Sequence, residues 1–174
     1  MKEYKTSEIR NVALAGHNGV GKTSLIEALL HIARVIDRPG TVDAGNTQSD
    51  YDPEEIKRKT SINATLFPLE MGGCKVNVLD CPGFRDFVGE IKSALRVADL
   101  AVLVVDGVVG PEVGTEFAWS VADELEMPRA IFVNKLDKER ANYQGALDKF
   151  AQSFSARVVP VALPVGIEAN LRGV

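Results

Sequence analysis

The sequence predicts an α/β fold, with a mostly parallel sheet, one antiparallel edge strand and helices on both faces of the sheet. Strand-like runs alternate with helix-like runs along the 174 residues, which favours parallel strands joined by helices. The run Leu100–Val105, "LAVLVV", is almost wholly apolar, as expected for a strand that is covered on both faces. Two runs around the turn "EMGG" indicate a hairpin, which adds the antiparallel edge strand.

The N-terminal third predicts one strand, one helix and a long loop. Ile9–Ala15 is a short apolar run that stops at a glycine, and we expect a strand there. Lys22–Val35 has leucine, isoleucine and alanine at helical spacing, so it predicts a helix. Asp37–Lys59 is rich in glycine, aspartate, threonine and proline and has few large apolar residues, which is typical of a long, mobile loop.

The rest of the chain continues the alternation. The hairpin occupies Ile62–Leu69 and Cys74–Leu79, on either side of the glycine turn. A proline-interrupted run near the end of the chain, Arg157–Gly166, indicates at most a broken strand. Between them, helical spacing and a short apolar run predict helices and one strand, in this order: helix Phe87–Ala98, helix Pro111–Glu126, strand Ala130–Val133 and helix Glu139–Phe154.

Composition narrows the class of protein. Apolar residues make up 45% and charged residues 25% of the chain, which is ordinary for a soluble globular domain. The net charge of −4 gives no broad reason to expect DNA or another nucleic acid as a partner. The polar N-terminus is no signal peptide, and no apolar run approaches the roughly 18 residues of a membrane span. Cys74 and Cys81 are interpreted as buried thiols, so we expect a cytoplasmic protein without membrane contact.

The strongest motif is "GHNGVGKT", between the first strand and the first helix. It fits the phosphate-loop pattern, in which glycines let backbone N–H groups cradle phosphate oxygens at a helix N-terminus. Lys22 would neutralise β- and γ-phosphates and Thr23 would ligate Mg²⁺. An accidental glycine-rich turn is the alternative, and the flanking strand and helix argue against it. The expected nucleotide contacts are Gly16, His17, Asn18, Gly19, Val20, Gly21, Lys22, Thr23 and Ser24.

A second motif, "DCPG", follows the second strand of the hairpin. Asp80 ends that strand, at the edge of the sheet where α/β proteins bind ligands, so its carboxylate can hold Mg²⁺ through water. Gly83 has no side chain to obstruct approach, and its N–H can reach a γ-phosphate. The pattern is weak alone and much stronger after a phosphate loop.

A third motif, "NKLD", follows the strand at Ala130–Val133. The carboxylate of Asp137 can accept hydrogen bonds from the ring N–H and the amino group of guanine, whereas adenine would leave it unpaired. The stem of Lys135 can lie against the base, and Asn134 can connect the base site to the phosphate loop. In isolation Asp137 could instead cap a helix. After the other two motifs, guanine is the favoured interpretation. A phosphate-loop kinase would leave this motif without a role.

The motif order "GHNGVGKT", "DCPG", "NKLD" resembles the G domain of translational GTPases. The stretches "GTVDAGNTQSDYDPEE", "RDFVGEIKSALRVADLAVLVVDGVVGPEVGTE" and "NKLDKERANYQGALDKF" are similar to elongation factor G, most of all to the divergent elongation factor G-like proteins, from about Ile9 to Gly173. The resemblance implies a phosphate-loop GTPase fold that binds GTP or GDP with Mg²⁺. It implies slow GTP hydrolysis, with Lys22 and Gly83 as catalytic groups, and a switch that works on the ribosome within a longer protein. The domain itself is expected to be a monomer.

The resemblance also assigns the mobile segments. The long loop would be switch I, so we expect residues 38–59 to be mobile without a γ-phosphate, and Asp80–Val97 would be switch II. A hydroxyl of switch I should ligate Mg²⁺ alongside Thr23 and Asp80. Ser61 fits that position best, with Thr60 as the alternative.

The sequence departs from the family pattern at two places. Phe84 stands where translational GTPases carry a histidine that orients the attacking water, and phenylalanine has no donor or acceptor for this. We interpret Phe84 as an apolar plug. A nucleotide-sensing module with little or no hydrolysis is therefore the alternative function. Gly19 replaces an aspartate of the family, and we expect the His17 side chain to point away from the γ-phosphate.

The end of the chain lacks a further family feature. We find no serine–alanine base-contacting loop after Phe154. By resemblance, residues 1–156 would be a G domain without its sixth strand and last base-contacting loop, and residues 157–174 would begin an inserted subdomain, truncated here. We accordingly expect weaker GDP binding than in a longer parent protein.

Overall fold

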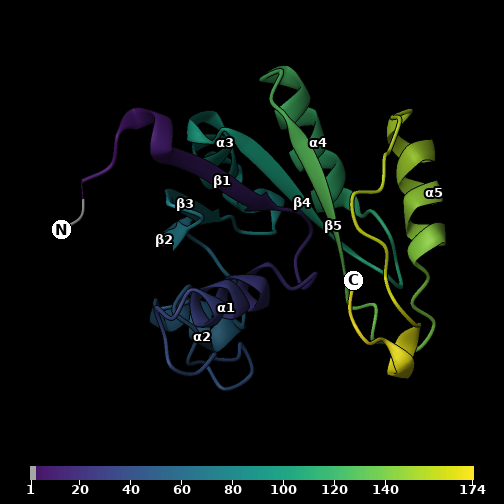
Figure 1. Cartoon of the computed structure of the whole chain (residues 1–174), viewed down its shortest axis with the longest axis horizontal. Helices are drawn as coiled ribbons and strands as arrows, with labels where there is room; N and C mark the ends of the chain where they lie inside the picture. The colour runs from purple at the N-terminus through teal and green to yellow at the C-terminus, as the bar shows by residue number, and fades with distance from the viewer. Residues whose placement is uncertain (1–2) are drawn as a thin grey trace.

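The parallel strands and the hairpin form one sheet in the computed structural model, which describes residues 3–174 (Figure 1). The strand order is β2-β3-β1-β4-β5, and β2 alone runs antiparallel to its neighbour. The predicted mostly parallel, five-stranded sheet with an antiparallel edge is confirmed. The strands are β1 (Ile9–Ala15), β2 (Thr65–Met71), β3 (Cys74–Asp80), β4 (Leu100–Asp106) and β5 (Arg129–Asn134).

Helices cover both faces of this sheet, as predicted. On β1, Leu14 packs with the apolar side of α1, whereas Ala13 and Ala15 point to the opposite face and join the core under α3 and α4. This division follows from the alternation of side chains along a strand. In the described chain the helices are α1 (Lys22–Ile32), α2 (Pro53–Arg58), α3 (Val88–Val97), α4 (Val113–Glu124) and α5 (Tyr143–Phe154).

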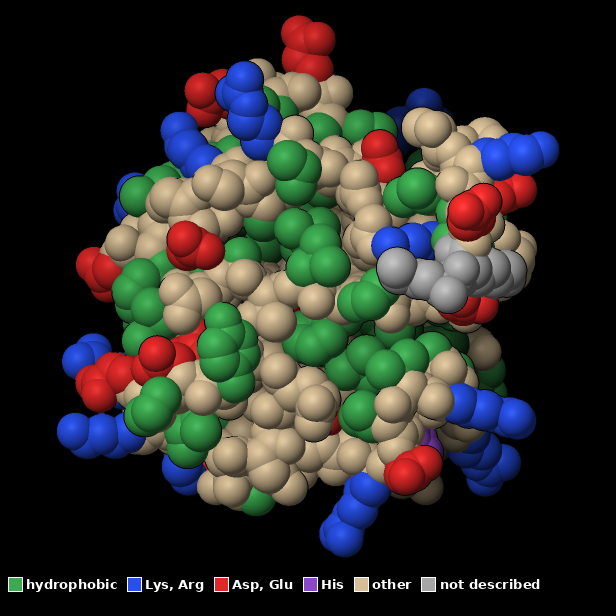
Figure 2. Space-filling model, turned by 90° about the vertical axis from the view of Figure 1, so that its left-hand side faces the viewer, with side chains coloured by type: hydrophobic (Ala, Val, Ile, Leu, Met, Phe, Trp, Pro, Cys, Tyr) green, Lys and Arg blue, Asp and Glu red, His purple; other side chains and the backbone are tan. Residues whose placement is uncertain are grey.

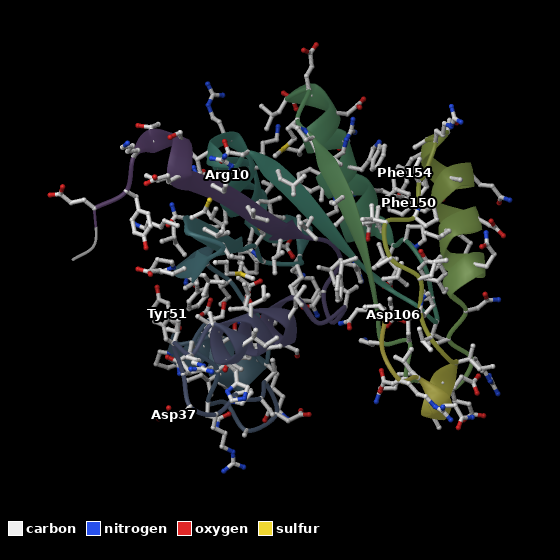
Figure 3. All side chains as sticks on the ribbon, in the orientation of Figure 1. Arg10, Asp37, Tyr51, Asp106, Phe150 and Phe154 are labelled. Atoms are coloured by element: carbon white, nitrogen blue, oxygen red, sulfur yellow. The ribbon has the colours of Figure 1, made fainter. Side chains whose placement is uncertain are left out.

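An aromatic cluster fixes α5 against α4. The Trp119 ring of α4 stacks on Phe154 at 4.6 Å between centroids and meets Phe150 edge-on at 5.2 Å. Figure 3 shows both phenylalanines on the side of α5 that faces the sheet. The guanidinium of Arg129 lies 4.2 Å from the centroid of Trp119 on the other side, a cation–π contact. Because Phe150 is fully buried, this cluster is the main attachment of α5.

The edge of the sheet at β2 is exposed. Pro68 lies in the middle of β2, opposite Asn77 of β3, and has no N–H for a further strand to pair with. Figure 2 shows the face of the molecule on this side, where apolar side chains are scattered among charged ones. On β2 itself, Leu66 and Met71 are exposed. No helix within residues 3–174 combines the length and the apolar character that crossing a bilayer requires.

The segment predicted as a long loop contains a helix, which corrects that prediction. Asp52 caps α2 by accepting the Glu54 N–H at 2.8 Å, and Pro53 occupies the first helical position. The pair of acids after "DP" is the signal that could have revealed it. Two buried carboxylates, those of Glu27 and Glu55, hold the segment in place. Glu27 of α1 accepts the N–H groups of Gly40 and Gln48.

Several other boundaries differ from the prediction for physical reasons. Glu55 accepts the N–H groups of Ile62 and Asn63, so β2 begins only at Thr65. Asn142 accepts the Gly145 N–H at 2.9 Å, and this cap starts α5 four residues later than expected. The proline-interrupted run near the end forms no strand beyond an isolated bridge between Val165 and Gly173.

Candidate functional site

The carboxyl ends of the parallel strands bring the three motifs to one edge of the sheet. Leu14 of β1 lies opposite Asp80 of β3, and Asp106 of β4 lies opposite Asn134 of β5. Each strand therefore delivers its following loop to the same side, where open α/β sheets bind ligands. Figure 3 labels Asp106 at this edge.

Glycines shape the loop after β1. Gly16, Gly19 and Gly21 have φ angles of +139°, +75° and +95°, which other residues rarely adopt. A side chain on Gly21 would also collide with the amide of Asn134. In this loop Val20 is buried and Gly19 is exposed, and Ser24 in the first turn of α1 is exposed as well. The turn therefore presents backbone between β1 and α1, as a phosphate cradle requires.

The Lys22 ammonium group lies over this loop. Its Nζ donates to the carbonyl oxygens of His17 at 2.8 Å and Gly16 at 3.2 Å, and the residue is only 6% exposed. Burial lowers the pKa of Lys22, although the Asp80 carboxylate opposes this shift. A buried cation whose hydrogen bonds go to carbonyl oxygens is well placed for an anionic ligand.

Hydroxyls from two segments meet the Asp80 carboxylate. Thr23 Oγ1 donates to Asp80 Oδ2 at 2.9 Å and lies 3.3 Å from Ser61 Oγ. All three side chains are buried. Thr60 instead donates to Asn18 Oδ1 at 2.8 Å, away from this cluster. The structure thus brings Thr23, Ser61 and Asp80 together and leaves Thr60 outside.

Two members of the cluster were not expected from the sequence. Ser49 Oγ donates to Asp80 Oδ2 at 2.7 Å, and Ser61 Oγ donates to Asp50 Oδ1 at 2.6 Å. Burial raises the pKa of Asp50. Both residues come from the segment predicted as a mobile loop. No local pattern marks them, because the contact with Asp80 joins positions 31 residues apart.

The residues of this cluster fit Mg²⁺. Within residues 3–174, Asp80 Oδ1 is fully buried and has no hydrogen-bond partner. Burial raises the pKa of Asp80 to about 6, against the attraction of Lys22. An orphaned carboxylate oxygen beside two hydroxyls matches the hard oxygen ligands that Mg²⁺ prefers. A metal ion would give that oxygen the partner that the protein does not supply.

The glycine of "DCPG" lies against the phosphate loop. A Cβ atom on Gly83 would be 2.5 Å from Asn18 Cα and 2.8 Å from Lys22 Nζ, so only glycine fits. The neighbouring Phe84 is 39% exposed. The interpretation of Phe84 as an apolar plug stays a prediction, because the residue is partly exposed but more than half of its surface is covered. Its exposure places an inert apolar side chain at the surface beside the site.

The third motif is connected to the phosphate loop, as expected. Asn134 Nδ2 donates to the Val20 carbonyl at 2.9 Å. Lys135 adopts a φ of +58°, and its Nζ lies 2.8 Å from Asp106 Oδ2. Burial acts to raise the pKa of Asp106, but hydrogen bonds from Lys135 and Val108 outweigh it, and the pKa is lowered. Asp106 therefore remains charged and holds the Lys135 stem in place.

Asp137 follows in this loop as an exposed residue. No helix begins there, because α5 starts at Tyr143 with Asn142 as its cap, so the helix-cap alternative for Asp137 is wrong. In the described part of the chain its carboxylate has no hydrogen bond or ion pair. It is therefore available to a ligand at the edge of the sheet.

The side chain of His17 points to α4, which agrees with the expectation that it turns away from the phosphates. Its Nδ1 accepts the Gly114 N–H at 3.2 Å, and its Nε2 lies 3.5 Å from Glu112 Oε2. His17 can contribute to the phosphate loop only through its backbone.

Comparisons with known proteins agree with this geometry. A model of the family described as "Elongation factor Tu GTP binding domain" matches residues 7–169. The elongation factor G-like protein of Mycobacterium tuberculosis is 44% identical over 158 residues, 91% of this chain and 22% of that protein. The elongation factor G-like protein of Thermotoga maritima is 39% identical over 95% of this chain and 24% of its own length.

A solved structure is equally similar. A crystal structure of a Thermus thermophilus protein superposes with a TM-score of 0.89 at 41% identity, over 95% of this chain and 25% of that one. The chain thus spans about a quarter of the length of the relatives that it matches. Matching motifs, a matching fold and this identity over nearly the whole chain lead to one assignment. The chain belongs to the elongation factor Tu GTP-binding domain family and is a GTP-binding domain of the elongation factor G-like kind.

Proposed function

We propose that this domain binds GTP and GDP together with Mg²⁺ and hydrolyses GTP slowly, as the nucleotide switch of a translational GTPase. One observation carries the proposal. At one edge of the sheet, the buried ammonium of Lys22 lies over a glycine-rich loop next to Asp80, whose Oδ1 has no partner among the described residues. This combination suits a phosphate–metal ligand and has no evident purely structural role.

In this proposal, side chains bind the metal ion and the backbone of the phosphate loop binds the phosphates. Thr23, Ser61 and Asp80 would hold Mg²⁺, which when bound would neutralise charge on the phosphate oxygens. The hydrogen bonds of Ser49 and Asp50 orient two of these ligands. The backbone of the phosphate loop would cradle the phosphates, in a turn that its glycines make possible.

Hydrolysis would depend on electrostatic stabilisation. Lys22 and the Gly83 N–H would face the place where charge develops on the γ-phosphate oxygens, and each would stabilise that charge. Phe84 offers no group that can orient the attacking water. We therefore expect a rate near that of an unassisted small GTPase, on the order of 10⁻⁴ to 10⁻³ s⁻¹.

The base would be guanine. Asp137 can accept the ring N–H and amino group of guanine, while Asn134 fixes the loop to Val20 and Lys135 is fixed by Asp106. The elongation factor names of the relatives support a further part of the proposal. A longer protein that contains this domain would act on the ribosome in the cytoplasm, and the domain itself would be monomeric.

The alternative is a nucleotide-sensing module that hardly hydrolyses GTP, and the exposed Phe84 favours it. Single-turnover hydrolysis of γ-labelled GTP separates the two functions. Release of phosphate at the rate given above, and faster release on addition of ribosomes to a full-length protein, supports the GTPase. Bound GTP that stays intact under both conditions supports the sensing module.

Phe84→Ala should change the hydrolysis rate by less than about tenfold, or under roughly 1.4 kcal/mol of barrier. The reason is that the ring supplies no donor, acceptor or charge to the reaction. Phe132→Ala is the matched control, because Phe132 is 40% exposed and lies on β5, outside the site. The measurement is single-turnover hydrolysis at saturating GTP. A hundredfold loss with unchanged GTP affinity, seen for Phe84 alone, would show that the ring belongs to the catalytic geometry.

A further inference from the structure

His17 joins the phosphate loop to α4 through a contact that nucleotide binding does not explain. The Gly114 N–H is one of the first N–H groups of α4 and has no partner within its own helix. His17 Nδ1 accepts this N–H at 3.2 Å, so the ring proton lies on Nε2, which is 3.5 Å from Glu112 Oε2. A side chain of the phosphate loop therefore satisfies an N-terminal N–H group of another element, 97 residues away in the chain, in addition to the capping box of Glu112 and Thr115.

Gly83, the glycine of "DCPG", also lies next to Gly114 at the start of α4. A Cβ atom on Gly114 would lie 2.6 Å from His17 Cα and 3.0 Å from the carbonyl oxygen of Gly83. The backbones of the phosphate loop, the "DCPG" turn and the start of α4 thus lie close together, with the His17 ring beside them. Because close-packed backbone transmits displacement, we expect a shift of Gly83 or of the loop to displace α4.

A displacement of α4 would reach the aromatic cluster. Ala118 and Ala122 of α4 are buried in the core against the sheet. Trp119 lies on this helix, between Phe154 at 4.6 Å and the guanidinium of Arg129 at 4.2 Å. It is the only tryptophan of the chain. Its emission therefore reports how α4 sits against α5 and β5.

We propose that His17 is a positioning residue that couples the phosphate loop to α4, so that nucleotide bound at the loop changes the packing of Trp119 between α4 and α5. The inference rests on the proposed function, since it requires that a γ-phosphate bind to Gly83 and the phosphate loop and shift their positions. The effector is a nucleoside triphosphate with Mg²⁺. Its binding changes the contact between α4 and α5, and Trp119 in that contact reports the change. Such coupling is a free energy shared between two sites.

The test measures the change in Trp119 emission between the nucleotide-free chain and the chain saturated with a non-hydrolysable GTP analogue and Mg²⁺. Calorimetry verifies saturation for every variant, whatever its affinity. Gly114→Ala should reduce this change by about threefold or more, because substitutions between two coupled sites can weaken the coupling. Gly89→Ala is the matched control. Gly89 is the second residue of α3, as Gly114 is of α4, and a Cβ on it meets nothing within 4 Å.

A second variant tests the other side of the contact. His17→Ala should reduce the change to the same extent, and His31→Ala, at the only other histidine, should leave it intact. An equal change in Gly114→Ala and Gly89→Ala, or in His17→Ala and His31→Ala, overturns the coupling. The coupling is also overturned if the Trp119 emission of the unaltered chain does not change on saturation with the GTP analogue and Mg²⁺. If calorimetry detects no guanine nucleotide binding to the unaltered chain, the proposed function itself is wrong, and the coupling fails with it.

Discussion

Lys22→Ala should abolish measurable binding of GDP and GTP. Lys22 is only 6% exposed, and its ammonium lies over the phosphate loop, so its loss leaves the phosphate charge uncompensated in a site with little water. Removing one partner of a buried charge pair costs about 2–5 kcal/mol or more, and we expect at least about a thousandfold loss of affinity here. Calorimetry with GDP and Mg²⁺ measures the effect.

The control for this variant is Lys92→Ala. Lys92 is a surface lysine of α3 that lies 3.5 Å from Glu124 and contacts none of the three motifs. Its replacement removes the same charge from the chain but should leave GDP affinity within about twofold, because screened surface charges contribute little. Affinity of Lys22→Ala within tenfold of the unaltered chain would contradict the assigned role of Lys22.

Asp137→Asn should move the nucleotide preference from guanine toward xanthine. The carboxylate of Asp137 is exposed and has no protein partner among the described residues, so it can accept both N–H groups of guanine. Asparagine presents an N–H₂ donor, which suits the 2-oxo group of xanthine and faces the 2-amino group of guanine unfavourably. Sites that read hydrogen bonds can discriminate by about 10⁴ or more, and we expect GDP affinity to fall at least about a hundredfold.

Competition between GDP and xanthosine diphosphate measures this shift. Asp148→Asn is the control, because Asp148 is an exposed acid of α5 whose carboxylate, among residues 3–174, accepts only from Gln144. The guanine site would have to lie elsewhere if Asp137→Asn kept the original preference, or if both variants lost GDP affinity equally.

Local patterns were enough for most of the fold. The apolar run of β4, the glycine turn of the hairpin and the helical spacing in α1 each depend on neighbours along the chain, and each was predicted. The connection of Asn134 to Val20 also followed from the sequence, since adjacent parallel strands bring their loops together. The nucleotide site was predicted from the order of the three motifs "GHNGVGKT", "DCPG" and "NKLD" along the chain.

Contacts between distant segments were not predictable in this way. Ser49 and Asp50 lie in a segment that Glu27 and Glu55, two buried carboxylates, hold by accepting backbone N–H groups on either side of these two residues. No periodicity marks a glutamate that will accept backbone N–H groups.

One calorimetric comparison tests the central claim most directly. GDP and ADP are each titrated, with Mg²⁺, into the unaltered chain. The arrangement of Lys22, Asp80 and Asp137 predicts that GDP binds at least about a hundredfold more tightly than ADP, since adenine would leave the Asp137 carboxylate unpaired. Equal affinities for GDP and ADP, or no binding of either, would contradict the assignment of a guanine nucleotide site.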